Sequence, residues 1–195
     1  MEIKKLIIRR IPIQGLLTNH EINYVNIDCL TEYMSEDVDL ADKIIDSFNQ
    51  LYQKDTSLIN RNCCDESNIS GQHVGERSIV FRYAHYLLNN IDSDTRYSSY
   101  DLDCEYNRNG NGLKTIADFS NGKYPDLIIH KRETNDNNLL IMEFKTWWNS
   151  QRVDILSDII KIAQFMNKSD IYKFKYGMSI ILNKDSVTIN CVEPR

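Results

Sequence analysis

Residues 124–145, YPDLIIHKRETNDNNLLIMEFK, contain two short apolar runs, 125–130 and 139–145, joined by a polar segment rich in Asn, Asp and Thr. Runs of this length, rich in Ile and Leu and separated by turn-forming residues, are typical of a β-hairpin. Charged side chains interrupt the runs where a plain hairpin does not need them, at Asp126, Glu143 and Lys145. A glutamate with Leu, Ile and Met before it and Phe and Trp after it is rarely buried without a partner.

The register of this hairpin predicts a pair of facing carboxylates. Side chains alternate between the two faces of a strand, so Glu143 and Lys145 share a face. If the hairpin closes with His130 opposite Leu139, Asp126 lies opposite Glu143, and directly opposed Cβ atoms are about 4.5–5.5 Å apart. Two carboxylates so close repel each other unless a cation lies between them, and oxygen ligands of this kind suit Mg²⁺. A structural salt bridge is the alternative interpretation of the same residues.

Pro125-Asp126 and Glu143-Phe144-Lys145 resemble the two motif halves of the PD-(D/E)XK nuclease superfamily. Glu76, in the stretch GERSIVFRYAHYLL, matches a further acidic residue that members carry on the helix before the core sheet. The resemblance covers residues 75–182. It implies a restriction-endonuclease-like fold and a Mg²⁺ ion, for which Mn²⁺ substitutes.

The same resemblance implies the roles of these residues. Asp126, Glu143 and Glu76 would bind the metal, and Lys145 would join them as a catalytic residue that orients or deprotonates the attacking water. For Glu76 the alternative is that an acid in a first helical turn simply complements the helix dipole.

Length and composition indicate a single globular domain over residues 1–195, with an N-terminal extension (1–70) and a catalytic core (75–182). No apolar run approaches ~18 residues, so we expect no membrane segment, and the N-terminus lacks a secretory signal, which favours the cytoplasm. The cysteines are odd in number and show no C-x-x-C spacing, so we expect reduced thiols and no zinc site. They are Cys29, Cys63, Cys64, Cys104 and Cys191.

The remaining apolar patterns predict an α/β fold with a mixed central sheet flanked by helices. Strands are expected at residues 3–13, 100–107, 176–182 and 187–192, and helices at 35–53, 76–90 and 151–167. Pro12 indicates an edge position for the first strand. Residues 54–74 are expected to form a loop. The order from residue 76 onward is that of an αβββαβ core, preceded by a strand–helix extension.

Some polar residues have two open interpretations. The inward face of the third helix is predicted to consist of Val153, Leu156, Ile160, Ala163 and Met166, and Lys161 faces either the site or water. Arg108 and Lys114, in a Gly/Asn turn, either reach a phosphate backbone or are solvated.

Two further features are interpreted as structural. Asp101, Asp103 and Glu105 share a strand face that we expect at an edge or in solvent. We expect His130 to end its strand near solvent.

The sequence therefore favours a Mg²⁺-dependent nuclease that hydrolyses phosphodiester bonds of nucleic acid, with DNA as the expected substrate. The net charge of −5 is unusual for a protein whose whole surface binds nucleic acid, although a local basic groove is compatible with it. The alternative is an interaction protein of an immunity or defence type, either non-catalytic or dependent on a partner. A homodimer or a protein partner would reconcile the acidity with cleavage.

Overall fold

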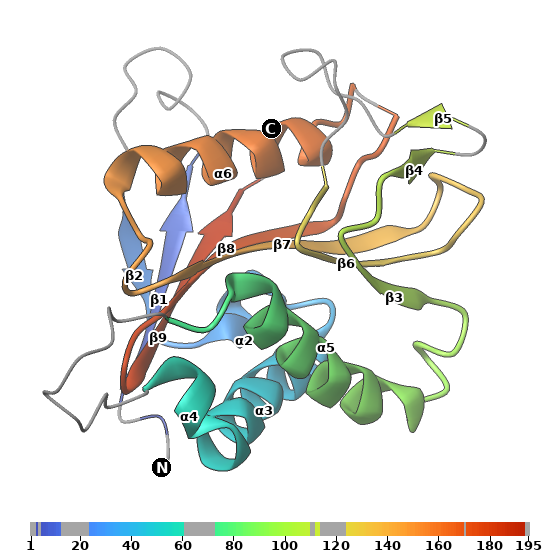
Figure 1. The fold of residues 1–195 in the computed structure, drawn as a ribbon. Helices are drawn as coiled ribbons and strands as arrows, with labels where there is room; N and C mark the ends of the chain where they lie inside the picture. Colours follow the sequence, from blue (N-terminus) through green and yellow to red (C-terminus); the bar gives the residue numbers. More distant parts are fainter. Residues whose placement is uncertain are drawn as a thin grey trace, which may run out of the picture.

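A computed structural model describes residues 3, 5–12, 24–60, 73–109, 112–113, 124–169 and 171–193. These residues form a seven-stranded sheet with the order β2-β1-β9-β8-β7-β6-β3 and a separate pair, β4-β5 (Figure 1). The strands of the large sheet are β1 (Lys5–Ile11), β2 (Val25–Ile27), β3 (Asp101–Cys104), β6 (Leu127–His130), β7 (Asn138–Thr146), β8 (Tyr176–Leu182) and β9 (Ser186–Val192). The small pair consists of β4 (Arg108–Asn109) and β5 (Gly112–Leu113).

The sheet is mixed, as the sequence predicts. β1 runs parallel to β9 and β7 parallel to β8, whereas the other neighbours in the large sheet are antiparallel. The edge position predicted for β1 from Pro12 is wrong, because β2 pairs with Ile8–Arg10 on its outer side. The proline follows the last paired residue of β1, so it removes no hydrogen bond from the ladder.

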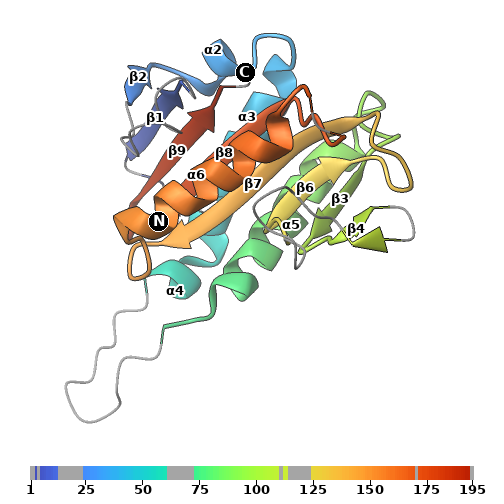
Figure 2. The same cartoon turned by 90° about the horizontal axis from the view of Figure 1, so that it is seen from above.

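Helices cover both faces of this sheet, which gives three layers (Figures 1 and 2). One face carries α2 (Leu30–Tyr33), α3 (Val38–Lys54), α4 (Thr56–Ile59) and α5 (Glu76–Asp92). The other face carries α6 (Arg152–Met166), which lies along β8. The expected order of helix, three strands, helix and strand is present as α5, β3, β6, β7, α6 and β8, with β4-β5 between β3 and β6.

Alternation along the strands divides the apolar side chains between the two layers. Met142 and Phe144 of β7 point toward α3 and α5, where the larger core lies, whereas Ile141 points toward α6. Gly177 of β8 allows the close approach of α6, because a Cβ atom there would lie 2.3 Å from side-chain atoms of both Ile162 and Met166. The apolar contacts of α6 with the sheet form a second, smaller core cluster.

The inward face of α6 differs from the prediction. Val153 is 65% exposed, and Leu156 and Ile160 are half-buried. The buried positions are instead Ile155, Asp158, Ile159, Ile162, Ala163, Phe165 and Met166. The helix is apolar around most of its circumference, so periodicity alone does not define its orientation. The rotation turns Asp158 toward the sheet.

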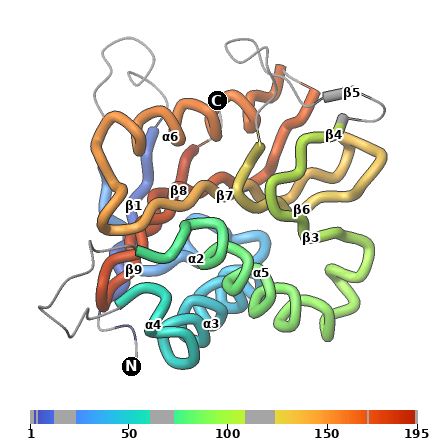
Figure 3. The backbone as a smooth tube through the Cα atoms, in the orientation of Figure 1, coloured from blue at the N-terminus to red at the C-terminus, as the bar shows by residue number. Residues whose placement is uncertain are grey.

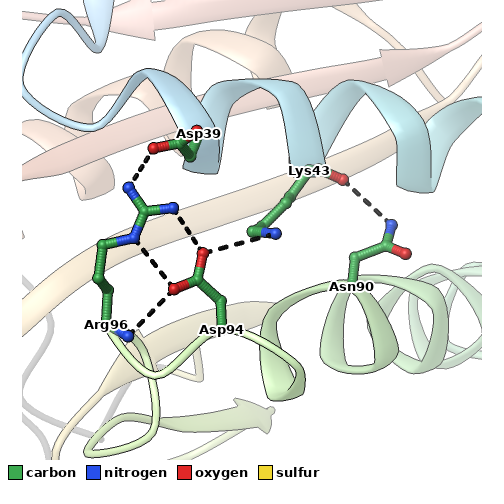
Figure 4. A network of polar contacts seen from close by, with 5 residues as sticks. All are labelled: Asp39, Lys43, Asn90, Asp94 and Arg96. Carbon is green, nitrogen blue, oxygen red and sulfur yellow. Dashed lines mark hydrogen bonds and ion pairs between the residues drawn. The ribbon is translucent and has the colours of Figure 1, made fainter.

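A polar network joins the end of α5 to α3 (Figure 4). The Arg96 guanidinium pairs with Asp94 and Asp39, and the Lys43 Nζ lies 3.6 Å from Asp94 Oδ2. The Asn90 side chain donates a hydrogen bond to the Lys43 carbonyl oxygen. These contacts hold the C-terminal end of α5 and the turn after it against α3.

Two smaller expectations need correction. Helix α3 begins at Val38 after Asp37, not at a Ser35 cap, and Asp37 instead accepts hydrogen bonds from Lys175 and Tyr176. The predicted loop at 54–74 contains α4, and residues 61–72, with Cys63 and Cys64, lie outside the described part.

The backbone trace shows β1 and β9 side by side, although they come from opposite ends of the sequence (Figure 3). No helix among the described residues has the length and apolar character needed to cross a membrane.

Candidate active site

The β6–β7 hairpin brings the first two predicted acids together. Leu127 pairs with Met142, so the same register places Asp126 opposite Glu143. The expected pairing of His130 with Leu139 is wrong, because the register shifts after Ile129 and His130 pairs with Asn138. The shift lies at the turn end of the hairpin, so the predicted juxtaposition of the two carboxylates is unaffected.

Asp126 lies just before β6, where β7 continues without a strand partner on that side. Its Oδ2 atom accepts a hydrogen bond of 2.7 Å from the Phe144 backbone N–H. Burial raises the pKa of Asp126, whereas that N–H and the ammonium groups of Lys161 and Lys145 act to lower it. The carboxylate thus takes the place of a missing strand neighbour and is held beside Glu143.

Glu143 is almost completely buried, with 1% of its surface exposed. Its Oε2 atom accepts a hydrogen bond of 2.5 Å from Lys161 Nζ of α6, and its Oε1 atom is buried without any hydrogen-bond partner. Burial, and next the neighbouring Asp126 carboxylate, raise the pKa of Glu143 well above its usual value. A second cation beside Oε1 would offset this cost.

Lys145 lies one pleat further along β7, on the same face. Its Nζ atom is 3.0 Å from Asp158 Oδ2 and 3.6 Å from Glu76 Oε1 in the first turn of α5. Burial acts to lower the pKa of Lys145, but Asp158 and then Glu76 outweigh it and raise this pKa above its usual value. Both acids therefore favour the ammonium form of Lys145, which also donates a hydrogen bond of 3.1 Å to the Phe144 carbonyl oxygen.

Glu76 closes the open end of the hairpin. Burial raises the pKa of Glu76, against the lowering effect of Lys145, and the Oε2 atom of Glu76 is buried without a hydrogen-bond partner. A helix-dipole role alone does not explain why this carboxylate points at Lys145. Helix α5 thus contributes an acid to the same group as β7 and α6.

The charges in this group do not balance. Four carboxylates (Glu76, Asp126, Glu143 and Asp158) surround two ammonium groups (Lys145 and Lys161), which leaves a formal excess of two negative charges. Within the described residues, no three His, Cys, Asp or Glu side chains lie close enough together to hold a metal ion, and the two lysines lie between the acids. The carboxylate oxygens are nevertheless the type of ligand that a hard cation prefers, and their negative charge suits it. The unpartnered Glu143 oxygen is free to bind such an ion.

A row of polar side chains extends from Glu143 across the sheet under α6. Glu143 pairs with Ser179 of β8, Ser179 with Asn190 of β9, and Asn190 with Arg9 of β1. Ser179 and Asn190 are both 0% exposed, and the Ser179 hydroxyl and both amide atoms of Asn190 have no hydrogen-bond partner. We call Glu143, Ser179 and Asn190 the polar row. Buried groups of this kind are commonly satisfied by ordered water.

The structure groups most of the predicted site residues and separates the rest. Glu76, Asp126, Glu143 and Lys145 lie together, and Lys161 faces them rather than water. Arg108 is exposed on β4, and no contact joins it to these acids in the described part of the chain. Lys114 lies outside the described residues.

Sequence reasoning missed Asp158 and the two uncharged members of the polar row. Asp158 stands three residues before Lys161, among Ile155, Ile159 and Ile162. An acidic residue among these apolar positions is the signal that could have identified Asp158, provided that the buried face of α6 is known. Ser179 and Asn190 carry no comparable signal, because they are ordinary residues in the YGMSIIL and SVTINCV strands.

A second polar cluster lies at the outer edge of the sheet, apart from these acids. Asp103 of the edge strand β3 contacts His130 Nε2 at 3.0 Å and Arg132 Nε at 2.9 Å. The edge position expected for Asp101 and Asp103 is confirmed, because β3 is an edge strand, whereas Glu105 lies after the end of β3. The expectation that His130 lies near solvent is wrong, since it is 2% exposed.

Comparison of the chain with models of protein families, with curated proteins and with solved structures gives no match.

Proposed function

We propose that this protein is a Mg²⁺-dependent nuclease with a restriction-endonuclease-like core, hydrolysing phosphodiester bonds of nucleic acid, with DNA as substrate. The observation that carries the proposal is Glu143, a buried carboxylate opposite Asp126 with one oxygen that has no partner. The Oε2 atom of Glu143 already pairs with Lys161, and a divalent cation at Oε1 would offset the remaining excess of two negative charges.

Asp126 and Glu143 would hold the ion, with Glu76 at the open end of the hairpin. A bound Mg²⁺ would polarise a phosphoryl oxygen and lower the pKa of a coordinated water. The ammonium group of Lys145 would donate to the attacking water or to a phosphoryl oxygen and offset negative charge that develops there. Asp158 and Glu76 contact this ammonium and hold it in position. Lys161, paired with Glu143 Oε2, orients that carboxylate.

The test combines cleavage with metal binding. Supercoiled plasmid, linear duplex and single-stranded DNA are incubated with Mg²⁺, Mn²⁺ or EDTA, using wild type, Glu143→Gln, Lys145→Met and Lys131→Met. We expect metal-dependent cleavage that falls about 100-fold or more in the first two variants. Lys131 is an exposed lysine in the β6–β7 turn, so the Lys131→Met control should cleave like wild type. Equal cleavage by all four proteins would contradict the site assignment.

One observation favours a second candidate, a non-catalytic interaction protein built on this scaffold. Both lysines of the group already pair with carboxylates, as they would in a purely internal ion-pair network. Mn²⁺ titration separates the two candidates. If the protein is a nuclease, Mn²⁺ should raise the melting temperature of the wild type but not that of Glu143→Gln. If the cluster is purely structural, Mn²⁺ should affect both proteins equally.

A third arrangement is a nuclease that needs a homodimer or another protein to bind DNA. Metal-dependent stabilisation without cleavage by the isolated protein, followed by cleavage when the partner is added, would identify it.

A further inference from the structure

A pocket of about 560 Å³ opens beside the proposed catalytic acids. Glu76 and Asp126 form part of its wall. The other described lining residues come from the first turns of α5, the end of β3 and the chain before β6, and they are Arg77, Val80, Phe81, Cys104, Glu105 and Tyr124. The volume lies within the range of pockets that take small organic groups.

Two aromatic side chains of this pocket are unusually exposed. Phe81 is 66% exposed and Tyr124 is 50% exposed, whereas Phe48, Tyr83 and Phe144 in the adjoining core are 0% exposed. Phe81 is not among the buried residues of α5, so its ring is not part of the core that the helix packs against. Exposed aromatic rings beside a phosphodiester-cleaving site are suited to stacking on nucleobases.

The charge around the pocket opposes tight binding of a phosphate backbone. Arg77 is the one cationic residue among the described lining residues, and its Nε atom lies 2.5 Å from Glu105 Oε1. The ammonium groups of Lys145 and Lys161 are likewise paired with carboxylates. Affinity for double-stranded DNA comes largely from Lys and Arg that neutralise phosphates, and the described lining of the pocket contributes no unpaired one.

We propose that the pocket binds an unpaired nucleobase, stacked on Phe81 and Tyr124, and that the substrate class is single-stranded DNA or a frayed end. In a duplex the faces of the bases are covered by their neighbours, so the aromatic rings cannot reach them. The proposal rests on the proposed nuclease function, because Glu76 and Asp126 place the pocket beside the scissile phosphate.

Fluorescence anisotropy of a labelled mixed-sequence oligodeoxynucleotide tests this directly, with Ca²⁺ in place of Mg²⁺ to measure binding apart from cleavage. The single strand is compared with its own duplex, using wild type, Phe81→Ala, Tyr124→Ala and Tyr24→Ala. Tyr24, 41% exposed beside β2 at the opposite edge of the sheet, is the matched aromatic control.

We expect tighter binding of the single strand than of the duplex, and a loss of about 5- to 100-fold in each pocket variant. The control should bind like wild type. Raising salt from about 50 to 200 mM should weaken binding by less than about tenfold, whereas proteins with many phosphate contacts lose about 10³–10⁵-fold over that range.

Tighter binding of the duplex, or unchanged single-strand affinity in both pocket variants, would overturn the proposal. Because binding is measured without turnover, its result is independent of the cleavage test. A protein that binds single strands through Phe81 and Tyr124 but never cleaves would refute the nuclease and support the pocket. If wild type and both pocket variants cleave duplex DNA equally well, the nuclease is supported and the nucleobase pocket is refuted.

Discussion

At the scale of single residues, Lys161 has the clearest energetic role in the candidate site. Its ammonium group is the hydrogen-bond donor to a glutamate whose side chain is 2% exposed, and 12% of the lysine side chain is exposed. Removing one partner of a buried ion pair leaves an uncompensated charge. The Lys161–Glu143 pair thus holds Glu143 in place, and loss of either partner should destabilise the fold.

We predict that Lys161→Met lowers the unfolding free energy by about 3 kcal/mol in EDTA, measured by urea denaturation. Mg²⁺ or Mn²⁺ should restore more stability to this variant than to wild type, because a cation beside Glu143 replaces the lost ammonium. The double variant Glu143→Gln with Lys161→Met should recover part of the loss without metal. A loss that neither metal nor the second substitution reduces would contradict this account.

Asp103 provides a pH-dependent prediction away from the site. Burial acts to raise its pKa, but hydrogen bonds from His130 and then Arg132 outweigh it and lower the pKa from 3.8 to about 2. Asp103→Asn should therefore cost roughly 1–2 kcal/mol at pH 7, after allowing for the partial exposure of the pair.

The sign of this effect follows from the lowered pKa. The Asp103 carboxylate stabilises the fold above the usual pKa of 3.8, and that contribution disappears as the pH falls toward 2. The stability difference between wild type and Asp103→Asn should thus be constant above about pH 5 and should shrink between about pH 4 and 2. A difference that grows on acidification would refute it.

At the scale of elements, the polar row connects the candidate site to the interior of the sheet. Asn190 lies in β9, two strands away from β7, and neither of its amide atoms has a protein partner. Leaving a buried amide unpaired costs free energy, and an apolar residue of similar size avoids that cost.

We predict that Asn190→Leu raises the unfolding free energy by about 1 kcal/mol in the absence of metal, measured by urea denaturation. Asn138→Leu is the matched control, because Asn138 is 6% exposed and its side chain donates a 2.5 Å hydrogen bond to the Tyr172 carbonyl oxygen. The control should be destabilised. If both variants lose stability, ordered water bound to Asn190 contributes more than an apolar contact does.

The elements also show what could be predicted from the sequence. The β6–β7 hairpin, α5 and β8 follow local apolar patterns, and all of them form close to the expected positions. The facing carboxylates of Asp126 and Glu143 were predictable because alternation and register fix them. The orientation of α6 could not be predicted, because Val153, Leu156 and Ile160 form as good an apolar stripe as the residues that are buried.

Other features depend on contacts that no local pattern contains. Asp158 is buried because Lys145 lies across from it on β7, and the sequence gives no measure of that distance. Strand β2 and helix α4 have three and four residues, too short for a periodicity to appear. The parallel pairing of β1 with β9 joins segments far apart in the chain.

At the scale of the whole molecule, β1 is an internal strand of the sheet. It pairs with β9 over its full length and with β2 on its other side, and Ile8 and Ile11 are 3% and 0% exposed. Strands β1 and β2 of the predicted N-terminal extension are therefore part of the central sheet.

We predict that removing residues 1–12 abolishes cooperative unfolding in urea, because β9 then becomes an unprotected edge and two core side chains are lost. Ile8→Ala gives a milder test and should cost about 2–4 kcal/mol. Lys5→Ala, at an exposed position of the same strand, is the control and should have little effect. A shortened chain with an unchanged unfolding midpoint would show that β1 is dispensable.

The β1–β9 pairing also bears on how this protein is made. A ribosome synthesises β1 long before β9 emerges, so the Leu6–Ile8 segment has no parallel neighbour during most of translation. An apolar strand that waits for its partner is exposed to wrong pairing with other chains. Completion of the sheet, and with it the burial of the polar row, must therefore wait until β9 has been synthesised.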